Sequence, residues 1–344
     1  MIVIIIAGGS GTRLWPISTP QYPKHLLRIN DDKLSLLQQT YERAKKLGNQ
    51  IFVVSEEGHI KYVKDQLKDL SEDAFISEPA RRGTANCIIA ALIHIKDKVD
   101  HDEPIAILSA DHYIRDLDGF AHTFKVAGEI ASQYQQIALI GIEPDYPATG
   151  FGYIKKDKLL NSEHLVYRVH SFKEKPDFKT AKDYLKSNNY LWNCGYFVAT
   201  FTTFIKEMKT YSSELYHNYQ QLSNSKEKYN DTYLMLNNQT IDYGLIEKVK
   251  NLMVVPASFD WLDLGSYADL HKAVDNNEEG NHIKGDNIET FEVENSFIQN
   301  FNKQPLIVVG LDNIVVVNTP DGVLVTRKDL SQKVGELSKK FYNK

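Results

Sequence analysis

Apolar positions follow two alternating patterns in the first half of the chain. Residues 2–6 form an unbroken run of Ile and Val, which is typical of a strand buried on both faces of a parallel sheet. Apolar residues at helical spacing come next, and further strand-like runs then alternate with helical patterns. These later runs are residues 51–54, 74–76, 104–108 and 137–142. The alternation predicts the α/β class, with a mostly parallel, doubly wound sheet.

The pattern changes in the middle of the chain, from about residue 146. Residues 166–172 and 191–198 are predicted to be strands. The apolar stripe over residues 201–222 then predicts one long helix that packs into the core. Residues 224–231 are polar and charged, which favours a solvated loop after that helix.

Short β-rich pieces begin after about Asp275. Residues 307–309, 314–317 and 323–325 are apolar and are separated by turn residues. This pattern is consistent with a separate β domain or with the coils of a β-helix. Apolar positions over residues 330–341 predict a terminal amphipathic helix.

Composition and charge exclude several classes of protein. The 344 residues are 42% hydrophobic and 25% charged, which suits a soluble protein with one large and one smaller domain. A net charge of −5 gives no sign of a nucleic-acid or membrane surface, so an anionic ligand needs local positive groups. Cys87 and Cys194 have no metal or disulfide spacing, which favours a reducing compartment. Residues 1–6 are too short for a signal peptide or membrane span, so we expect a cytoplasmic protein.

A glycine-rich loop follows the first predicted strand. Gly8, Gly9 and Gly11 allow positive φ and let backbone N–H groups approach a ligand closely. Arg13 and Lys24 follow, and both can hold phosphate oxygens. The spacing matches neither the Walker loop nor the dinucleotide fingerprint. On the glycines alone a tight turn is about as good an interpretation, but with the two cations the segment predicts a polyphosphate site.

Two carboxylates lie beside turns far apart in the sequence. Asp111 directly follows a predicted buried strand, where open α/β sheets place ligand groups. Its position alone fits a helix cap equally well. Asp263 lies before Gly265 in a second turn. Carboxylate oxygens of this kind suit a hard divalent cation such as Mg²⁺.

The glycine loop also carries a family resemblance. The pattern G-G-x-G-T-R-L-x-P with a lysine shortly after it resembles the signature loop of the sugar-1-phosphate nucleotidylyltransferases. Trp15-Pro16 and Tyr22-Pro23-Lys24 resemble the mannose-1-phosphate guanylyltransferase branch of that family. Further segments, in family order, extend the resemblance over nearly the whole chain. It implies a Rossmann-like nucleotide-diphospho-sugar transferase domain over residues 1–275. A short left-handed β-helix-like domain with a terminal helix is implied over residues 276–344, and in this family it often helps dimerisation.

The resemblance also assigns roles to residues. Arg13, Lys24 and Lys175 are implied as catalytic charges, and Asp111 and Asp263 as ligands of Mg²⁺. The implied nucleotide-binding residues are Ala7, Gly8, Gly9, Gly11, Thr12, Arg13, Lys24, Gly83, Thr84 and Asp111. The implied sugar-binding residues are Gly150, Glu174, Lys175, Asn193 and Asp263.

Two positions depart from the family pattern, and a third has an alternative explanation. Ser109 stands where many members have proline, which leaves Asp111 unaffected. Arg82-Gly83 stands where the family often has an asparagine before Thr-Ala, so a guanine contact from that asparagine is not carried over. Asp242, in a segment resembling S-I-D-Y-x-x-x-E-K, is expected to order the site, although a helix N-terminal carboxylate explains it at least as well.

The reaction implied by the resemblance is GTP plus α-D-mannose 1-phosphate giving GDP-mannose and pyrophosphate. It needs no protein nucleophile, and the histidines show no zinc pattern, so His112 is expected to be structural. The alternatives are another manno-configured sugar phosphate such as a heptose, glucose 1-phosphate with dTTP or UTP, and a silent ligand-binding regulatory subunit. The resemblance implies a homodimer. We expect a single activity, because the chain stops where longer relatives continue into a cupin isomerase domain.

Overall fold

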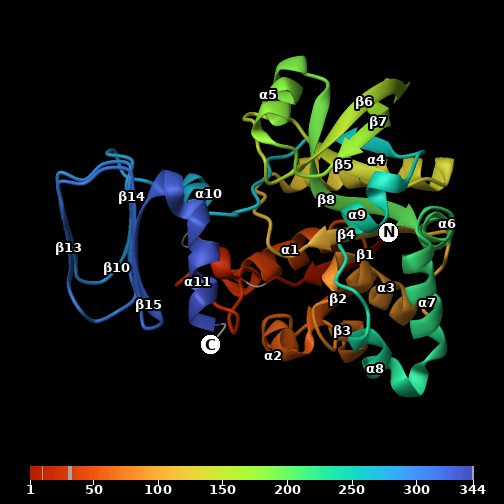
Figure 1. Cartoon of the computed structure of the whole chain (residues 1–344), viewed down its shortest axis with the longest axis horizontal. Helices are drawn as coiled ribbons and strands as arrows, with labels where there is room; N and C mark the ends of the chain where they lie inside the picture. The colour runs from red at the N-terminus through yellow and green to blue at the C-terminus, as the bar shows by residue number, and fades with distance from the viewer. Residues whose placement is uncertain (10, 30–32, 343–344) are drawn as a thin grey trace. The chain divides into compact units, whose positions relative to one another are not determined.

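The computed structural model describes residues 1–9, 11–29 and 33–342. It divides into two compact units (Figure 1). The sheet unit consists of Met1–Ala7, Thr40–Ala110 and Ile114–Trp261, and the β-helix unit of Gly8–Gln39, Asp111–Tyr113 and Leu262–Lys344. The chain therefore passes between the units several times, and the glycine loop belongs to the same unit as the C-terminal strands. The predicted boundary at residue 275 stays a prediction.

The sheet unit is built on nine strands in the order β3-β2-β1-β4-β8-β5-β9-β7-β6. Strands β1 to β4 pair in parallel, as do β5 and β9. Strand β8 is antiparallel to both β4 and β5, and β6 and β7 are also antiparallel. The predicted α/β class with a parallel core is confirmed, while the antiparallel strands make the sheet mixed. The strands are β1 Ile2–Ala7, β2 Ile51–Glu56, β3 Phe75–Glu78, β4 Pro104–Ser109, β5 Ala138–Ile142, β6 Gly152–Asn161, β7 Val166–Lys173, β8 Tyr190–Thr200 and β9 Met253–Pro256.

Helices pack against this sheet because its central strands are apolar on both faces. Ile2, Ile4 and Ile5 of β1 are fully buried, α3 packs against β1, β2 and β3, and α4 packs against β4, β5, β8 and β9. No described helix is both long and apolar enough to cross a membrane. The helices are α1 Leu36–Lys45, α2 Glu57–Gln66, α3 Gly83–Ile95, α4 Leu117–Tyr134, α5 Phe178–Ser187, α6 Phe201–Tyr211, α7 Ser213–Asn224, α8 Tyr229–Leu234 and α9 Ile241–Gly244. The 3-10 helices are η1 Thr12–Leu14, η2 Lys24–Leu26, η3 Glu72–Ala74, η4 Lys226–Lys228, η5 Ile246–Lys248 and η6 Lys328–Lys333.

Two local predictions in this unit are wrong. The single helix over residues 201–222 is two helices, because Ser212 leaves helical geometry and its hydroxyl caps α7 by accepting from the Leu215 N–H. The expected loop over residues 224–231 contains η4 and the start of α8. Helix α8 is anchored by Tyr233, which is fully buried and donates to the Glu78 carboxylate.

The β-helix unit stacks short strands in coils. Strands β10, β12 and β14 pair in parallel, β11 pairs in parallel with β13, and β15 closes the four-stranded sheet antiparallel to β14. Ile298, Val308 and Val316 pack inside the coils, so the β-helix alternative is confirmed. The elements are β10 His282–Gly285, β11 Ile288–Phe291, β12 Phe297–Asn300, β13 Leu306–Val309, β14 Ile314–Thr319, β15 Gly322–Arg327, α10 Tyr267–Ala273 and α11 Val334–Tyr342. The terminal helix begins at Val334, because residues 328–333 form η6 instead.

Glycine is required at one corner of the β-helix, which gives a test of the coil geometry. Gly285 has φ +114, and a Cβ there would overlap the Asn300 carbonyl oxygen. Gly310 has φ +65 with no atom within 4 Å of a built Cβ. We expect Gly310→Ala to cost about 1 kcal/mol through backbone strain alone. Gly285→Ala should cost about 3 kcal/mol, because the overlap adds to the strain. Denaturant unfolding followed by circular dichroism measures both, and equal losses would contradict the coil geometry.

Candidate active site

Lys24 and two aspartates form a closely connected charged group in the β-helix unit. The Lys24 Nζ lies 2.8 Å from Asp111 Oδ2 and 3.3 Å from Asp263 Oδ1, and it also donates to the Asp263 carbonyl oxygen. An ammonium has three donors, so each of them has an acceptor. The two predicted metal ligands and one predicted phosphate ligand therefore meet in one place.

Backbone pairing explains why the two aspartates meet. The Tyr113 N–H donates to the Leu262 carbonyl at 2.9 Å, and the Leu262 N–H donates to the Tyr113 carbonyl at 3.0 Å. This antiparallel bridge joins the segments that carry Asp111 and Asp263. The helix that follows β4 is capped by Asp116, which accepts from the Gly119 N–H at 2.9 Å. The helix-cap interpretation of Asp111 is therefore excluded.

The glycine loop brings Lys24 to this place. Gly11 has φ +63, and a Cβ on it would approach Pro23 Cα to 2.8 Å. Only glycine allows this contact between the loop and the turn before η2, which begins at Lys24. The Ser18 hydroxyl donates to the Gly11 carbonyl and holds the same loop. Gly9 also has positive φ, with open space around it, so its backbone is accessible to a ligand.

The C-terminal helices hold the segment that carries Arg13. The Ser338 hydroxyl of α11 donates to the Thr12 carbonyl at 3.0 Å, and the Tyr267 hydroxyl of α10 donates to the Leu14 carbonyl at 2.9 Å. Figure 1 shows α11 alongside this N-terminal segment. The Arg13 side chain is 68% exposed, and its Nη1 lies 3.9 Å from Asp263 Oδ2. The guanidinium is therefore near the aspartates but available to a ligand.

The charges of this group favour a bound cation. Burial lowers the pKa of Lys24, but attraction to Asp111 and Asp263 outweighs it and raises that pKa above its ordinary value. Donor atoms of Asp111, His112 and Asp263 lie within 4.8 Å of one another. Asp111 and Asp263 share one buried ammonium, while the Arg13 guanidinium beside them is exposed, and carboxylate oxygens suit a hard divalent cation. The residues therefore fit a divalent metal. The sequence predicted only a structural role for His112, which lies close enough to the two aspartates to be a third ligand.

A second polar group lies in the sheet unit. The Lys175 Nζ pairs with Glu174 Oε1 at 2.9 Å, and the Asn193 Nδ2 donates to Asp242 Oδ1 at 2.8 Å. Gly152 lies between the two pairs, because a Cβ on it would approach Glu174 Oε2 to 2.5 Å and Asn193 Cβ to 3.3 Å. Three predicted sugar-side residues are thus grouped around one glycine.

Two side chains of this second group have pKa values raised above their ordinary values. Burial, together with the nearby Glu174 carboxylate, raises the pKa of Asp242 to about 6. Burial lowers the pKa of Lys175, but its pairing with Glu174 and its attraction to Asp242 outweigh burial and raise it. The expected site residues did not include Asp242, and the resemblance of its segment to the family helix was the only signal for it.

The remaining predicted residues lie in less specific surroundings. The Thr84 hydroxyl accepts from the Ile241 N–H at 2.9 Å, and Gly83, at φ +82, faces the Gln239 carbonyl. These two residues therefore hold the loop before Asp242, and their role at the base stays a prediction. The Ala7 carbonyl accepts from the Ser55 hydroxyl, and Gly150 lies exposed before β6.

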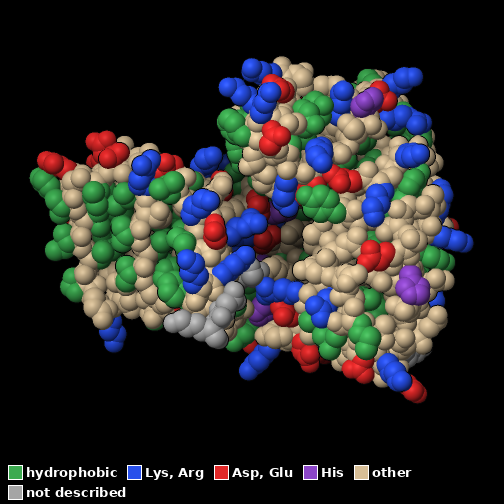
Figure 2. Space-filling view, viewed as in Figure 1, with side chains coloured by type: hydrophobic (Ala, Val, Ile, Leu, Met, Phe, Trp, Pro, Cys, Tyr) green, Lys and Arg blue, Asp and Glu red, His purple; other side chains and the backbone are tan. Residues whose placement is uncertain are grey.

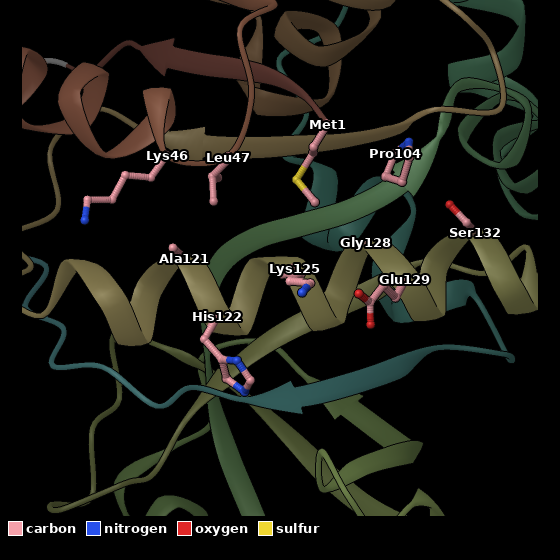
Figure 3. A pocket seen from close by; sticks show the side chains of 10 residues that line it. All are labelled: Met1, Lys46, Leu47, Pro104, Ala121, His122, Lys125, Gly128, Glu129 and Ser132. Carbon is pink, nitrogen blue, oxygen red and sulfur yellow. The ribbon is translucent and has the colours of Figure 1, made fainter.

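A pocket along α4 is separate from these groups. Figure 3 shows its lining, with Lys46 and Leu47, which directly follow α1, facing side chains of α4. It contains none of the predicted site residues, so we do not assign the reaction to it. The lining residues are Met1, Lys46, Leu47, Pro104, Ala121, His122, Lys125, Gly128, Glu129 and Ser132.

Comparison with known families agrees with both units. Residues 2–280 match the nucleotidyl transferase family, and residues 286–341 match the family described as a MannoseP isomerase/GMP-like beta-helix domain. The resemblance predicted from the glycine loop is therefore confirmed, as is the fold class of a transferase domain followed by a β-helix.

Individual relatives cover nearly all of the chain. A mannose-1-phosphate guanylyltransferase of Escherichia coli is 32% identical over 97% of this chain and 74% of its own length. The alginate biosynthesis protein AlgA of Pseudomonas fluorescens is 34% identical over 98% of this chain and 71% of its own. A solved structure described as a mannose-1-phosphate geranyltransferase from Thermus thermophilus has a TM-score of 0.87 and 24% identity, over 99% of both chains. This chain belongs to the nucleotidyl transferase family and is similar over nearly its whole length to relatives named mannose-1-phosphate guanylyltransferase.

Proposed function

We propose that the protein transfers GMP from GTP to α-D-mannose 1-phosphate, giving GDP-mannose and pyrophosphate. The observation that carries the proposal is the pairing of Lys24 with Asp111 and Asp263 in a chain of the nucleotidyl transferase family. A glycine loop and a cation can bind the phosphates of a nucleoside triphosphate, and two carboxylates can bind its metal ion. The names of the relatives support the choice of GTP and mannose 1-phosphate.

The reaction is an in-line displacement at phosphorus. A phosphate oxygen of the sugar phosphate forms a bond to the α-phosphorus of GTP, and the bond to pyrophosphate breaks. The second pKa of a phosphomonoester is about 6, so the attacking group is already an anion near neutral pH. No protein base is needed, and the work of the protein is positioning and charge neutralisation.

Positive groups of this chain supply that neutralisation. Arg13 is exposed beside the aspartates. Lys24 would bind a phosphate in exchange for one of its three contacts with Asp111 and Asp263. Lys175, 51% exposed and paired with Glu174, is suited to the phosphate of the sugar. Asp111 and Asp263 would hold Mg²⁺, which when bound neutralises triphosphate charge and orients the phosphate groups.

The sugar is assigned to the group around Gly152. Glu174 is only 7% exposed, and its Oε2 has no hydrogen-bond partner among the described residues. A buried carboxylate oxygen of this kind is stabilised by a hydroxyl donor, which a sugar ring supplies. Other manno-configured sugar phosphates, glucose 1-phosphate with dTTP or UTP, and silent ligand binding remain the alternatives that experiment must separate.

A second copy of the chain is the partner that we propose. Phe291, Ile307 and Val309 are 63%, 69% and 56% exposed and lie on the paired strands β11 and β13; we call them the β11–β13 patch. Figure 2 shows hydrophobic side chains gathered in rows over the β-helix strands. Contiguous apolar patches mark interfaces, and one patch facing its own copy forms a closed dimer.

Pyrophosphate release tests the proposed reaction. Purified protein with Mg²⁺ is combined with GTP, ATP, UTP or dTTP, each with mannose 1-phosphate and with glucose 1-phosphate. We expect release with GTP and mannose 1-phosphate alone. Release from dTTP or UTP with glucose 1-phosphate would contradict the assignment of base and sugar, and release from none would favour silent binding.

Asp263→Asn tests the carboxylate of the metal group. Removing one anionic ligand should lower turnover by about 10³-fold, because charge stabilisation in the transition state is lost. The dissociation constant for GTP, measured by calorimetry, should change less. Asp312→Asn, an exposed position in the same unit, is the matched control. Unchanged turnover of Asp263→Asn with Mg²⁺ would remove the residue from this role.

Lys24→Met tests the buried ammonium. Its loss should lower kcat/KM by about 10²-fold, because one positive charge on the transferring phosphates is missing. The control is Lys303→Met, which removes the same charge from an exposed position of the β-helix unit. If both variants keep wild-type kinetics, Lys24 has no part in the reaction.

Ile307→Glu tests the partner proposal. A charge within the β11–β13 patch would be buried without a partner in a dimer, so we expect the variant to be monomeric. Light scattering after size-exclusion chromatography measures the mass. Leu159→Glu, at an exposed apolar position of the sheet unit, should leave the dimer intact. A monomeric wild-type protein would contradict the proposal.

A further inference from the structure

We infer that Asp242 is a positioning residue for the sugar phosphate, because its carboxylate determines which way the Asn193 amide faces. The inference rests on the proposed function and deepens it. Asn193 on β8 is only 7% exposed. Its Nδ2 donates to Asp242 Oδ1 at 2.8 Å, and its Oδ1 accepts from the Gly195 N–H at 3.2 Å. Both ends of the amide are thus engaged.

The Asn193 amide still has one hydrogen-bond donor and one acceptor available to a ligand. A carboxamide has two N–H donors and two acceptor lone pairs, and the contacts with Asp242 and Gly195 use one of each. One donor and one acceptor remain, and neighbouring sugar hydroxyls are both donors and acceptors. Rotation about the last side-chain bond exchanges the donor and acceptor ends, and the Asp242 carboxylate, together with the weaker contact from the Gly195 N–H, disfavours the exchanged orientation. A fixed orientation is therefore a requirement for recognising one arrangement of hydroxyls.

The backbone on both sides keeps this contact in place. The pairing of β5 with β8 shifts register between Leu139 and Gly141, which is a bulge in β8, and Gly195 within it has φ +74. Bulges turn side chains toward sites, and here the bulge aims the Gly195 N–H at Asn193. On the other side α9 is held by the Ile241 N–H, which donates to Thr84.

A purely structural role explains Asp242 poorly. Helix α9 has only four residues, so little helix dipole is available to a carboxylate in its first turn. Burial and the Glu174 carboxylate both disfavour its charged form and raise its pKa to about 6. An ionisable group kept beside a buried like charge costs stability, and such groups cluster at functional sites.

The test compares two substitutions at residue 242. Asp242→Ala removes the acceptor, and we expect the KM for mannose 1-phosphate to rise at least tenfold while the KM for GTP stays within twofold. Asp242→Asn keeps an oxygen acceptor without the charge, so its KM should stay within about threefold of wild type. Asp231→Ala, an exposed aspartate of α8, is the matched control and should leave both KM values unchanged.

A double-mutant cycle shows whether Asp242 acts through Asn193. In an Asn193→Ala background, Asp242→Ala should have no further effect on the KM for the sugar phosphate. An equal rise in both backgrounds would overturn the inference, as would an unchanged KM in Asp242→Ala. An equal rise in the KM for the sugar phosphate in Asp242→Asn and Asp242→Ala, together with equal falls in their thermal midpoints, would mean a structural role. That result would also overturn the inference.

One readout does not depend on turnover. In ¹⁵N–¹H spectra the side-chain NH₂ signals of Asn193, assigned by their loss in Asn193→Ala, should exchange slowly in wild type and at least tenfold faster in Asp242→Ala. Equal exchange rates would overturn the inference. Absence of turnover with every substrate pair, with slow exchange retained, would instead reject the proposed function and leave the positioning contact supported.

Discussion

The contact of one buried lysine with two aspartates is the constraint on which the candidate site depends. Lys24 satisfies Asp111 and Asp263 at once, and without it the two carboxylates would repel each other in a partly buried place. Two features support this contact: Gly11 lets the glycine loop approach the turn before Lys24, and the Tyr113–Leu262 bridge joins the segments that carry the aspartates. The β-helix unit therefore does more than extend the chain, since α10 and α11 hold the segment that carries Arg13.

The sheet unit also places a lysine beside acidic side chains. Lys175 is paired with the buried Glu174, and Asp242 holds Asn193 nearby. In both groups a lysine lies beside more negative charge than it can balance. That imbalance suits ligands that bring their own cation or their own hydroxyl donors. Arg13, Lys24 and Lys175 are the local positive groups that a chain of net charge −5 offers to phosphate compounds.

Local sequence signals predicted the parts of the fold that depend on neighbouring residues. The apolar run of β1 and the glycines after it identify a buried strand and a phosphate loop, because burial and positive φ are demands on single positions. The break at Ser212 was missed because the apolar stripe continues through it, and only the cap reveals it. Helix α8 was missed because its polar surface conceals the one buried anchor, Tyr233.

The sequence by itself determined the strand–glycine loop, the α/β class, the β-rich C-terminal part and the chemical types of the site residues. Tertiary structure alone decided which of them meet. The segments that carry Asp111 and Asp263 are joined by a backbone bridge, and Asn193 on β8 meets Asp242 on α9. The physical reason is that such contacts arise from register and chain crossing between distant segments, and no local pattern of residues encodes the register.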